Sequence, residues 1–285
     1  SRCFSPSKWS VQRRDLFSQV SLVFFDTTSL YFEGAGGETL GAHGHSKDHR
    51  PDLKQMVLAV ILDGAGEPLC CELWPGNTTD VKTLVPVADR LQARFGITQV
   101  CIVADRGMIS RETLAALEAR QWQYILGARM RVENEVRREV VAKLLPTDTS
   151  GPRPGFMEVQ PERRKKKDPS PLQVREVCVG AHRYVACYNP EQARKDAYDR
   201  HAIIASLREQ LKHGDKSLVG NKGYRKYLKA NGSRYEIDEA RAKADATYDG
   251  LWVLRTNTQL SAVEVALHYK QLWRVERIFR DSKTL

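Results

Sequence analysis

The stretch "SLVFFDTTSLYFEG", residues 21–34, decides the fold class because its apolar run stops at a single acid. The apolar residues 22–25 predict a buried strand that ends on Asp26. A second run, "QVCIVAD" at residues 99–105, ends in the same way on Asp105. If these strands are parallel neighbours, their final acids meet at the edge of a sheet where α/β proteins bind ligands.

The other patterns in the first half of the chain predict a mixed α/β sheet. Two long apolar runs flank the turn "GAGE" and indicate a hairpin. A helical pattern follows, with Thr79 or Asp80 as its candidate cap and Gly96 as its end. The expected elements are strands at 22–26, 54–63, 68–76, 99–105 and 122–130, and helices at 81–96 and 110–121.

Residues 131–258 depart from this alternation of strands and helices, and their pattern predicts a β-rich inserted subdomain. A long helix in it is expected to start at Pro190, with Asn189 as its cap, and to end at Gly214. The expected strands lie at 156–160, 172–180 and 182–189 and over much of 235–257.

The last element is a helix over residues 262–283, opened by an S-x-x-E capping box at Ser261. Positions seven apart on a helix return to within about 20° of each other, so Tyr269, Glu276 and Lys283 are expected to share one stripe. Apolar residues lie beside that stripe, so the acid and the base are partly buried. A plainer interpretation pairs Glu276 with Arg280 one turn later.

Asp26, Asp105 and Glu276 would thus stand on rigid elements, and clustered carboxylates repel one another unless a cation neutralises them. Oxygen ligands suit Mg²⁺ or Mn²⁺ rather than zinc. Two such ions about 3.5–4 Å apart clamp the attacking and leaving oxygens of a phosphoryl displacement. Taken alone, Asp26 could instead make an Asx turn with a following threonine.

The charge of the chain favours an acidic polymer as partner. The formal net charge is +10, and residues 131–255 hold 26 Lys+Arg against 18 Asp+Glu, so most of the surplus lies there. The run "RRKKKD" is either a solvated loop or a source of phosphate contacts. No apolar run approaches the roughly 20 residues needed to cross a bilayer.

Seven motifs together resemble the DDE transposases of bacterial insertion sequences. They are "FFDTTSLYFE", "GHSKDHRPDLKQ", "WPGNTTDVKTL", "VADRGMIS", "YNPEQARKD", "LRTNTQLS" and "YKQLWRVERIFRDSK". The resemblance favours the group with a β-rich insertion between the second Asp and the Glu. It implies a ribonuclease H-like core formed by residues 1–130 and 259–285, interrupted by the insertion at 131–258.

The same resemblance implies the chemistry. Asp26, Asp105 and Glu276, separated by 79 and 171 residues, would be catalytic and would hold two Mg²⁺ or Mn²⁺ ions. The implied activity is DNA cleavage at transposon ends, followed by attack of the freed 3′-OH on target DNA. The implied partners are double-stranded DNA and a second copy in a synaptic homodimer, without a membrane, at the nucleoid in the bacterial cytoplasm.

The family's helix motif places Tyr, Arg, Glu and Lys at fixed spacings, and this chain has Leu272 at the Arg position. Arg280 could reach a phosphate instead. The resemblance implies that Tyr269, Arg280 and Lys283 contact DNA. Two further DNA contacts are expected in the loop motif "GHSKDHRPDLKQ". Those two are Lys47 and Arg50.

Two points stay open on the sequence. Asp80 is either a helix cap or part of a positioning loop, "WPGNTTD". The chain begins with Ser and its last helical pattern runs into the final residue, so we expect truncation at both ends. A truncated or domesticated DNA-binding protein that no longer cleaves is therefore the alternative function.

Overall fold

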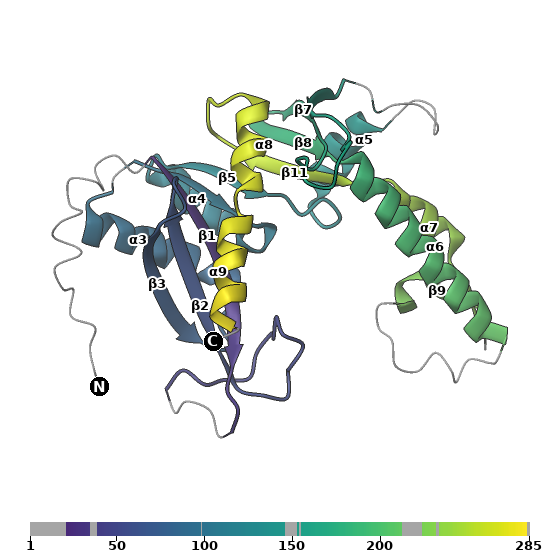
Figure 1. Ribbon diagram of the computed structural model, residues 1–285, viewed down its shortest axis with the longest axis horizontal. Coiled ribbons are helices and arrows are strands. Elements are labelled where there is room, and N and C mark those ends of the chain that lie inside the picture. Colours follow the sequence, from purple (N-terminus) through teal and green to yellow (C-terminus); the bar gives the residue numbers. More distant parts are fainter. Residues whose placement is uncertain are drawn as a thin grey trace.

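The computed structural model describes residues 21–34, 39–97, 99–145, 153, 155–212, 224–231 and 234–283. Within them the chain forms a nine-stranded mixed sheet of order β3-β2-β1-β4-β5-β11-β8-β7-β6, with a separate two-stranded sheet of β9 and β10 (Figure 1). The strands are β1 (Leu22–Tyr31), β2 (Gln55–Asp63), β3 (Pro68–Pro75), β4 (Cys101–Ala104), β5 (Gln123–Gly127), β6 (Met157–Gln160), β7 (Leu172–Val179), β8 (His182–Tyr188), β9 (Leu228–Asn231), β10 (Arg234–Ile237) and β11 (Leu251–Thr256).

The first five strands form the mixed α/β sheet that the sequence predicted. β1, β2 and β3 are antiparallel neighbours, and β1, β4 and β5 run parallel. Helices α3 (Leu84–Phe95) and α4 (Arg111–Ala119) pack on one face of this sheet. Helices α8 (Ala262–Lys270) and α9 (Trp273–Lys283) pack on the other. Alternating residues of β1 serve the two faces, Phe25 toward α3 and Phe24 toward α9.

Strand β1 is longer than the sequence indicated. The strand expected to end on Asp26 continues to Tyr31, because its antiparallel pairing with β2 persists to the Tyr31–Gln55 pair. Its parallel pairing with β4 stops at Phe25 and Ala104. Asp26 therefore lies where β1 loses β4 as a neighbour, and Asp105 is the corresponding residue after β4.

The strands of residues 131–258 extend the same sheet. β11 pairs antiparallel with both β5 and β8, so β8, β7 and β6 follow outward from it. The side chain of Asn257 secures the joint by accepting from the Tyr124 amide at 2.8 Å and donating to the Trp122 carbonyl at 3.0 Å. The sheet thus runs without interruption across the proposed boundaries at 130 and 258.

Two helices of this segment form an arm that projects from the sheet (Figure 1). They are α6 (Pro190–Lys212) and α7 (Glu239–Ala246), joined by a small apolar cluster of Ile204, Leu207, Tyr227 and Ala242. Asn189 caps α6 as expected, accepting from the Glu191 amide at 2.9 Å. The expected end of α6 at Gly214 lies outside the described residues.

The strand expected over much of 235–257 is wrong at residues 239–246, which form α7. The alternating pattern "EARAKADA" imitates a strand, but its residues other than Asp are strong helix formers. Asp238 caps the helix by accepting from the Arg241 amide at 2.9 Å. Local propensity and the cap therefore outweigh the alternation.

The C-terminal helix is also interrupted, so the single helix expected over 262–283 is wrong. Its capping box forms as expected at Ser261 and Glu264. At the break, Leu272 donates to the Tyr269 carbonyl and Val275 donates to the Leu272 carbonyl, the tighter i→i+3 pattern. Leu272, 8% exposed, packs into the apolar cluster below α9. Tyr269 and Glu276 consequently stand on two different helices.

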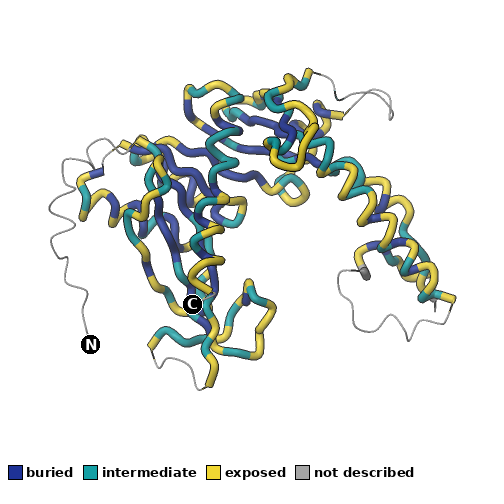
Figure 2. The backbone as a smooth tube through the Cα atoms, in the orientation of Figure 1, coloured by how far each residue is buried: buried dark blue, intermediate teal, exposed yellow. Residues whose placement is uncertain are grey.

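Figure 2 shows buried backbone concentrated in the central strands, with exposed residues along the arm and the outer helix faces. Apolar side chains of β1, β4, β5 and β11 supply much of this buried layer. Among the described helices, none is long and apolar enough to span a membrane.

Candidate active site

Asp26 and Asp105 occupy neighbouring positions at the point where β1 and β4 separate. Asp26 accepts a hydrogen bond from the Thr27 amide at 2.7 Å. Burial raises the pKa of Asp26 to about 6, with Lys47 opposing that rise and the charges of Asp105 and Asp80 adding to it. The site therefore holds a carboxylate whose ionised form lacks sufficient compensation from the protein alone.

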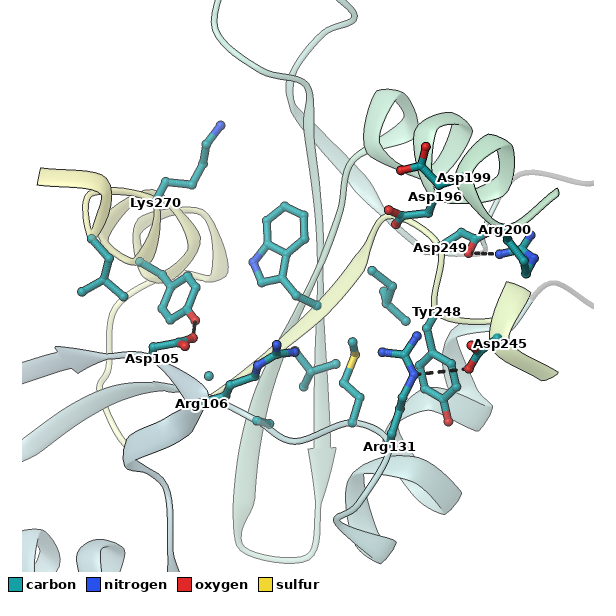
Figure 3. Close-up of a pocket in the computed structure, with 18 of the residues that line it drawn as sticks. Asp105, Arg106, Arg131, Asp196, Asp199, Arg200, Asp245, Tyr248, Asp249 and Lys270 are labelled. Carbon is teal, nitrogen blue, oxygen red and sulfur yellow. Dashed lines mark hydrogen bonds and ion pairs between the residues drawn. The ribbon is translucent and has the colours of Figure 1, made fainter. Parts of the chain in front are cut away.

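Tyr269 contacts the second acid directly. Its phenolic hydroxyl donates to Asp105 Oδ1 at 2.8 Å, as the dashed line beside Asp105 shows in Figure 3. Burial and the charge of Asp105 raise the pKa of Tyr269 well above its ordinary value of 10. The phenol thus stays protonated and serves as a permanent donor. The sequence predicted Tyr269 as a DNA contact, and the structure engages it with Asp105.

Glu276, exposed in the first turn of α9, lines the same cavity as Asp26 and Asp105. This cavity has a volume of about 680 Å³ and reaches from the acids to the base of the arm. Within the part of the chain that the structure describes, no three His, Cys, Asp or Glu side chains are close enough to form a metal site. The arrangement is an adjacent pair of acids with a third facing the same space.

The donor chemistry fits a divalent cation. Asp26 and Asp105 offer carboxylate oxygens, the ligands that Mg²⁺ and Mn²⁺ prefer. The raised pKa of Asp26, to which the charge of Asp105 contributes, shows negative charge that a cation would compensate. Glu276 lines the same cavity and carries a carboxylate of the same kind.

Asp80 is a site-proximal acid that the sequence left undecided. It opens a 3-10 turn, Asp80–Lys82, and α3 begins only at Leu84, so neither Thr79 nor Asp80 caps that helix. The Asp80 carboxylate instead accepts from the Thr27 hydroxyl at 2.7 Å and pairs with Lys47 Nζ at 3.2 Å. Its position after the hairpin strand β3 was the only sequence signal for this role.

The basic residues that were expected to contact DNA lie in different parts of the structure. Lys283 Nζ pairs with Asp48 Oδ1 at 2.6 Å, and these two residues line a second cavity together with Arg50. Arg50 also pairs with Asp52 at 2.9 Å. Arg280 is exposed on α9, whereas Lys47 turns back onto β1.

The far part of the main cavity carries ion pairs that sequence patterns did not reveal. Arg131 and Lys226 both pair with Asp245, at 3.4 and 2.9 Å, and Figure 3 shows the Arg131 pair. Arg200 and Asp249 form a second pair beside them. These residues come from three distant segments, so no local motif unites them.

The chain matches a known protein family. The family described as "Transposase DDE domain" matches residues 18–285, and the chain therefore belongs to the DDE transposases. This confirms the resemblance that the sequence motifs indicated. No curated protein matches the chain.

Two solved structures show partial similarity. The Mos1 transposase paired-end complex with left transposon end has 19% identity and a TM-score of 0.27, covering 42% of this chain and 43% of that one. A pre-cleavage Mos1 transpososome has 17% identity and a TM-score of 0.26, covering 40% and 42%. The chain thus spans less than half the length of each Mos1 chain.

Proposed function

We propose that this chain cleaves double-stranded DNA at transposon ends and joins the freed 3′-OH to target DNA. The proposal rests mainly on the positions of Asp26 and Asp105, which follow the last paired residues of two neighbouring parallel strands. Glu276 lines the same cavity. Membership of the DDE transposase family supplies the reaction class.

Asp26, Asp105 and Glu276 are the residues that would hold the divalent ions, Mg²⁺ or Mn²⁺. The family resemblance implies two such ions. When bound, such ions supply charge stabilisation and an activated nucleophile for phosphoryl displacement. The protein's own groups orient the ligands: the Thr27 amide holds one Asp26 oxygen and the Tyr269 hydroxyl holds one Asp105 oxygen. These two hydrogen bonds leave the second oxygen of each acid unengaged.

DNA would enter along the surfaces beside these acids, where basic residues also lie. Arg106 and Arg131 line the main cavity, and Arg50 and Lys283 line the second one. We assign phosphate contacts to Arg50, Arg280 and Lys283, consistent with the net charge of +10. A homodimeric synaptic complex and association with the bacterial nucleoid belong to the same proposal.

The test compares cleavage and binding in the same preparations. Asp26→Asn, Asp105→Asn and Glu276→Gln should each abolish Mg²⁺-dependent nicking of a transposon-end duplex, while gel-shift affinity for the duplex stays within a few-fold. Asp89→Asn, which removes an exposed acid paired with Arg120 on the surface, is the matched control. Undiminished nicking by Asp26→Asn, or binding without nicking by the wild-type chain, would contradict the proposal.

Strand transfer is read separately from cleavage. A pre-cut end with a free 3′-OH should become joined to a supercoiled plasmid in the presence of Mg²⁺. Cleavage without joining would identify a nuclease rather than a transposase.

A further inference from the structure

Asp80 lies where the two acid-bearing strands diverge. β1 continues past Asp26, whereas the chain after Asp105 turns away in a 3-10 turn, Arg106–Met108. Asp80 Oδ1 accepts from the hydroxyl of Thr27, the residue after Asp26, at 2.7 Å. Its Oδ2 lies so near Gly107 that a Cβ built there would be 3.4 Å away. One carboxylate therefore binds the residue after Asp26 and lies beside the turn after Asp105.

Lys47 completes the contact from the loop before β2. Its Nζ donates to the Thr27 carbonyl at 2.6 Å and to the Thr27 hydroxyl at 3.0 Å, and pairs with Asp80 Oδ2 at 3.2 Å. The Lys47 amide also donates to the Ser29 hydroxyl at 2.8 Å. Thr27 and Ser29 are only 1% and 2% exposed, so loss of these partners would leave buried polar groups unsatisfied.

The turn after Asp105 is also held by a guanidinium. Arg129 Nε donates to the Arg106 carbonyl at 3.1 Å and Nη2 donates to the Gly107 carbonyl at 3.2 Å. The turn thus has Asp80 near Gly107 and Arg129 on its carbonyls. The Arg129 hydrogen bonds hold the backbone of the turn rather than the Asp105 carboxylate itself.

We infer that Asp80, Thr27 and Lys47 form a positioning cluster that sets the spacing between the Asp26 and Asp105 carboxylates. In this arrangement Asp80 acts through its neighbours, because its Oδ1 is engaged by Thr27 and its Oδ2 by Lys47. The inference rests on the proposed function, in which the two acids share a divalent ion. Outer partners that orient metal ligands typically contribute about 10- to 100-fold in metal affinity.

Thr27 offers the cleanest test because it carries no charge. Thr27→Val removes the shared hydroxyl while keeping the shape and suiting a strand. Thr27→Ser keeps the hydroxyl and is the rescue variant. Thr28→Val is the matched control, since the next residue of a strand faces the opposite side of the sheet. The readout is Mn²⁺ affinity of the DNA-free protein, from the electron paramagnetic resonance signal of free Mn²⁺, with thermal unfolding as the check on folding.

Thr27→Val should weaken Mn²⁺ binding about tenfold or more, whereas Thr27→Ser and Thr28→Val should stay within twofold of wild type. Unchanged Mn²⁺ affinity in a folded Thr27→Val protein would overturn the inference. Tighter binding would also overturn it, because it would show that the released Asp80 carboxylate is itself a ligand. Wild-type Mn²⁺ binding that Asp26→Asn does not reduce would instead refute the proposed metal site, and the inference with it.

Discussion

The hydroxyl of Tyr269 donates to Asp105 Oδ1 across 2.8 Å, although the two residues lie 164 positions apart in the chain. Tyr269 lies in the last turn of α8, just before the break that separates α8 from α9. The Tyr269 phenol therefore links the end of α8, which leads into the helix that carries Glu276, to the strand end that carries Asp105. Removing that hydrogen bond should disturb the acids without disturbing the core.

Tyr269→Phe should slow single-turnover cleavage by about tenfold or more, because a hydrogen bond to a charged group contributes roughly 1.5–3 kcal/mol. The ring still fills its place, so the thermal unfolding temperature should change little. Tyr198→Phe, at a tyrosine that is 74% exposed, is the matched control. Wild-type cleavage by Tyr269→Phe would show that the phenol does not orient Asp105.

Gly127→Ala should affect the same contact by steric means. A Cβ at Gly127 would lie 2.7 Å from the Tyr269 hydroxyl and 2.8 Å from the Arg106 amide, and the amide belongs to a rigid turn. We expect a stability loss of roughly 1–3 kcal/mol and a drop in cleavage of at least tenfold. Gly64→Ala is the control, because its Cβ would meet only ordinary contacts at 3.6 Å and beyond. Urea unfolding and cleavage assays on both variants decide the matter.

Asp26→Asn should stabilise the metal-free protein at high pH. The pKa of Asp26 is raised to about 6 by burial, from an ordinary 3.8. The folded state therefore holds this proton more tightly than the unfolded state, and stability falls as pH rises from about 4 to 6. Above pH 7 the full penalty is present, and the neutral Asn removes up to about 3 kcal/mol of it. Urea unfolding in a chelator should show the gain at pH 8 and almost none below pH 4.

A gain that persists unchanged at pH 3.5 would show that the stabilisation has another origin than the charge of Asp26. Added Mg²⁺ should reverse the ranking at pH 8, since only the wild-type carboxylate holds the ion well. Asp89→Asn, on the surface of α3, should show neither effect.

Asp48→Asn should strengthen DNA binding by releasing Lys283. The two side chains are 2.6 Å apart, and Asp48 Oδ2 is buried without a hydrogen-bond partner among the described residues. One additional phosphate contact steepens the dependence of log affinity on log salt by about 0.9. Fluorescence anisotropy across a salt series measures this slope. The gain should vanish in the Asp48→Asn/Lys283→Met double variant, and its survival there would exclude Lys283 as the cause.

Much of the fold could be predicted because local patterns agree with the tertiary structure. The hairpin of β2 and β3, the Ser110-capped helix α4 and the Asn189-capped helix α6 all form as the sequence indicated. Gly96 ends α3 in a left-handed conformation at φ 67°, which glycine adopts without strain. Asp26 and Asp105 were placed together because parallel neighbours must end at one edge.

The remainder depends on contacts that no local pattern encodes. The sequence left Asp80 undecided between a helix cap and a positioning loop, because its partner Thr27 is 53 positions away. Alternation suggested a strand at residues 239–246, where helix propensity prevailed. The heptad spacing assumed one straight helix, but the burial of Leu272 accompanies a tightened turn that separates Tyr269 from Glu276. Arg131, Lys226 and Asp245 met only through the fold.

The pairing of β5 with β11 has a consequence for biosynthesis. Gly127 and Leu254 face each other across 127 residues of chain, so this joint closes only after the whole intervening segment has been made. Contacts of such long sequence separation form slowly. Glu276 follows β11, so its acid joins the other two last. If the proposed function holds, a nascent chain on the ribosome is unable to cut DNA until the residues up to Glu276 have emerged and the three acids can meet.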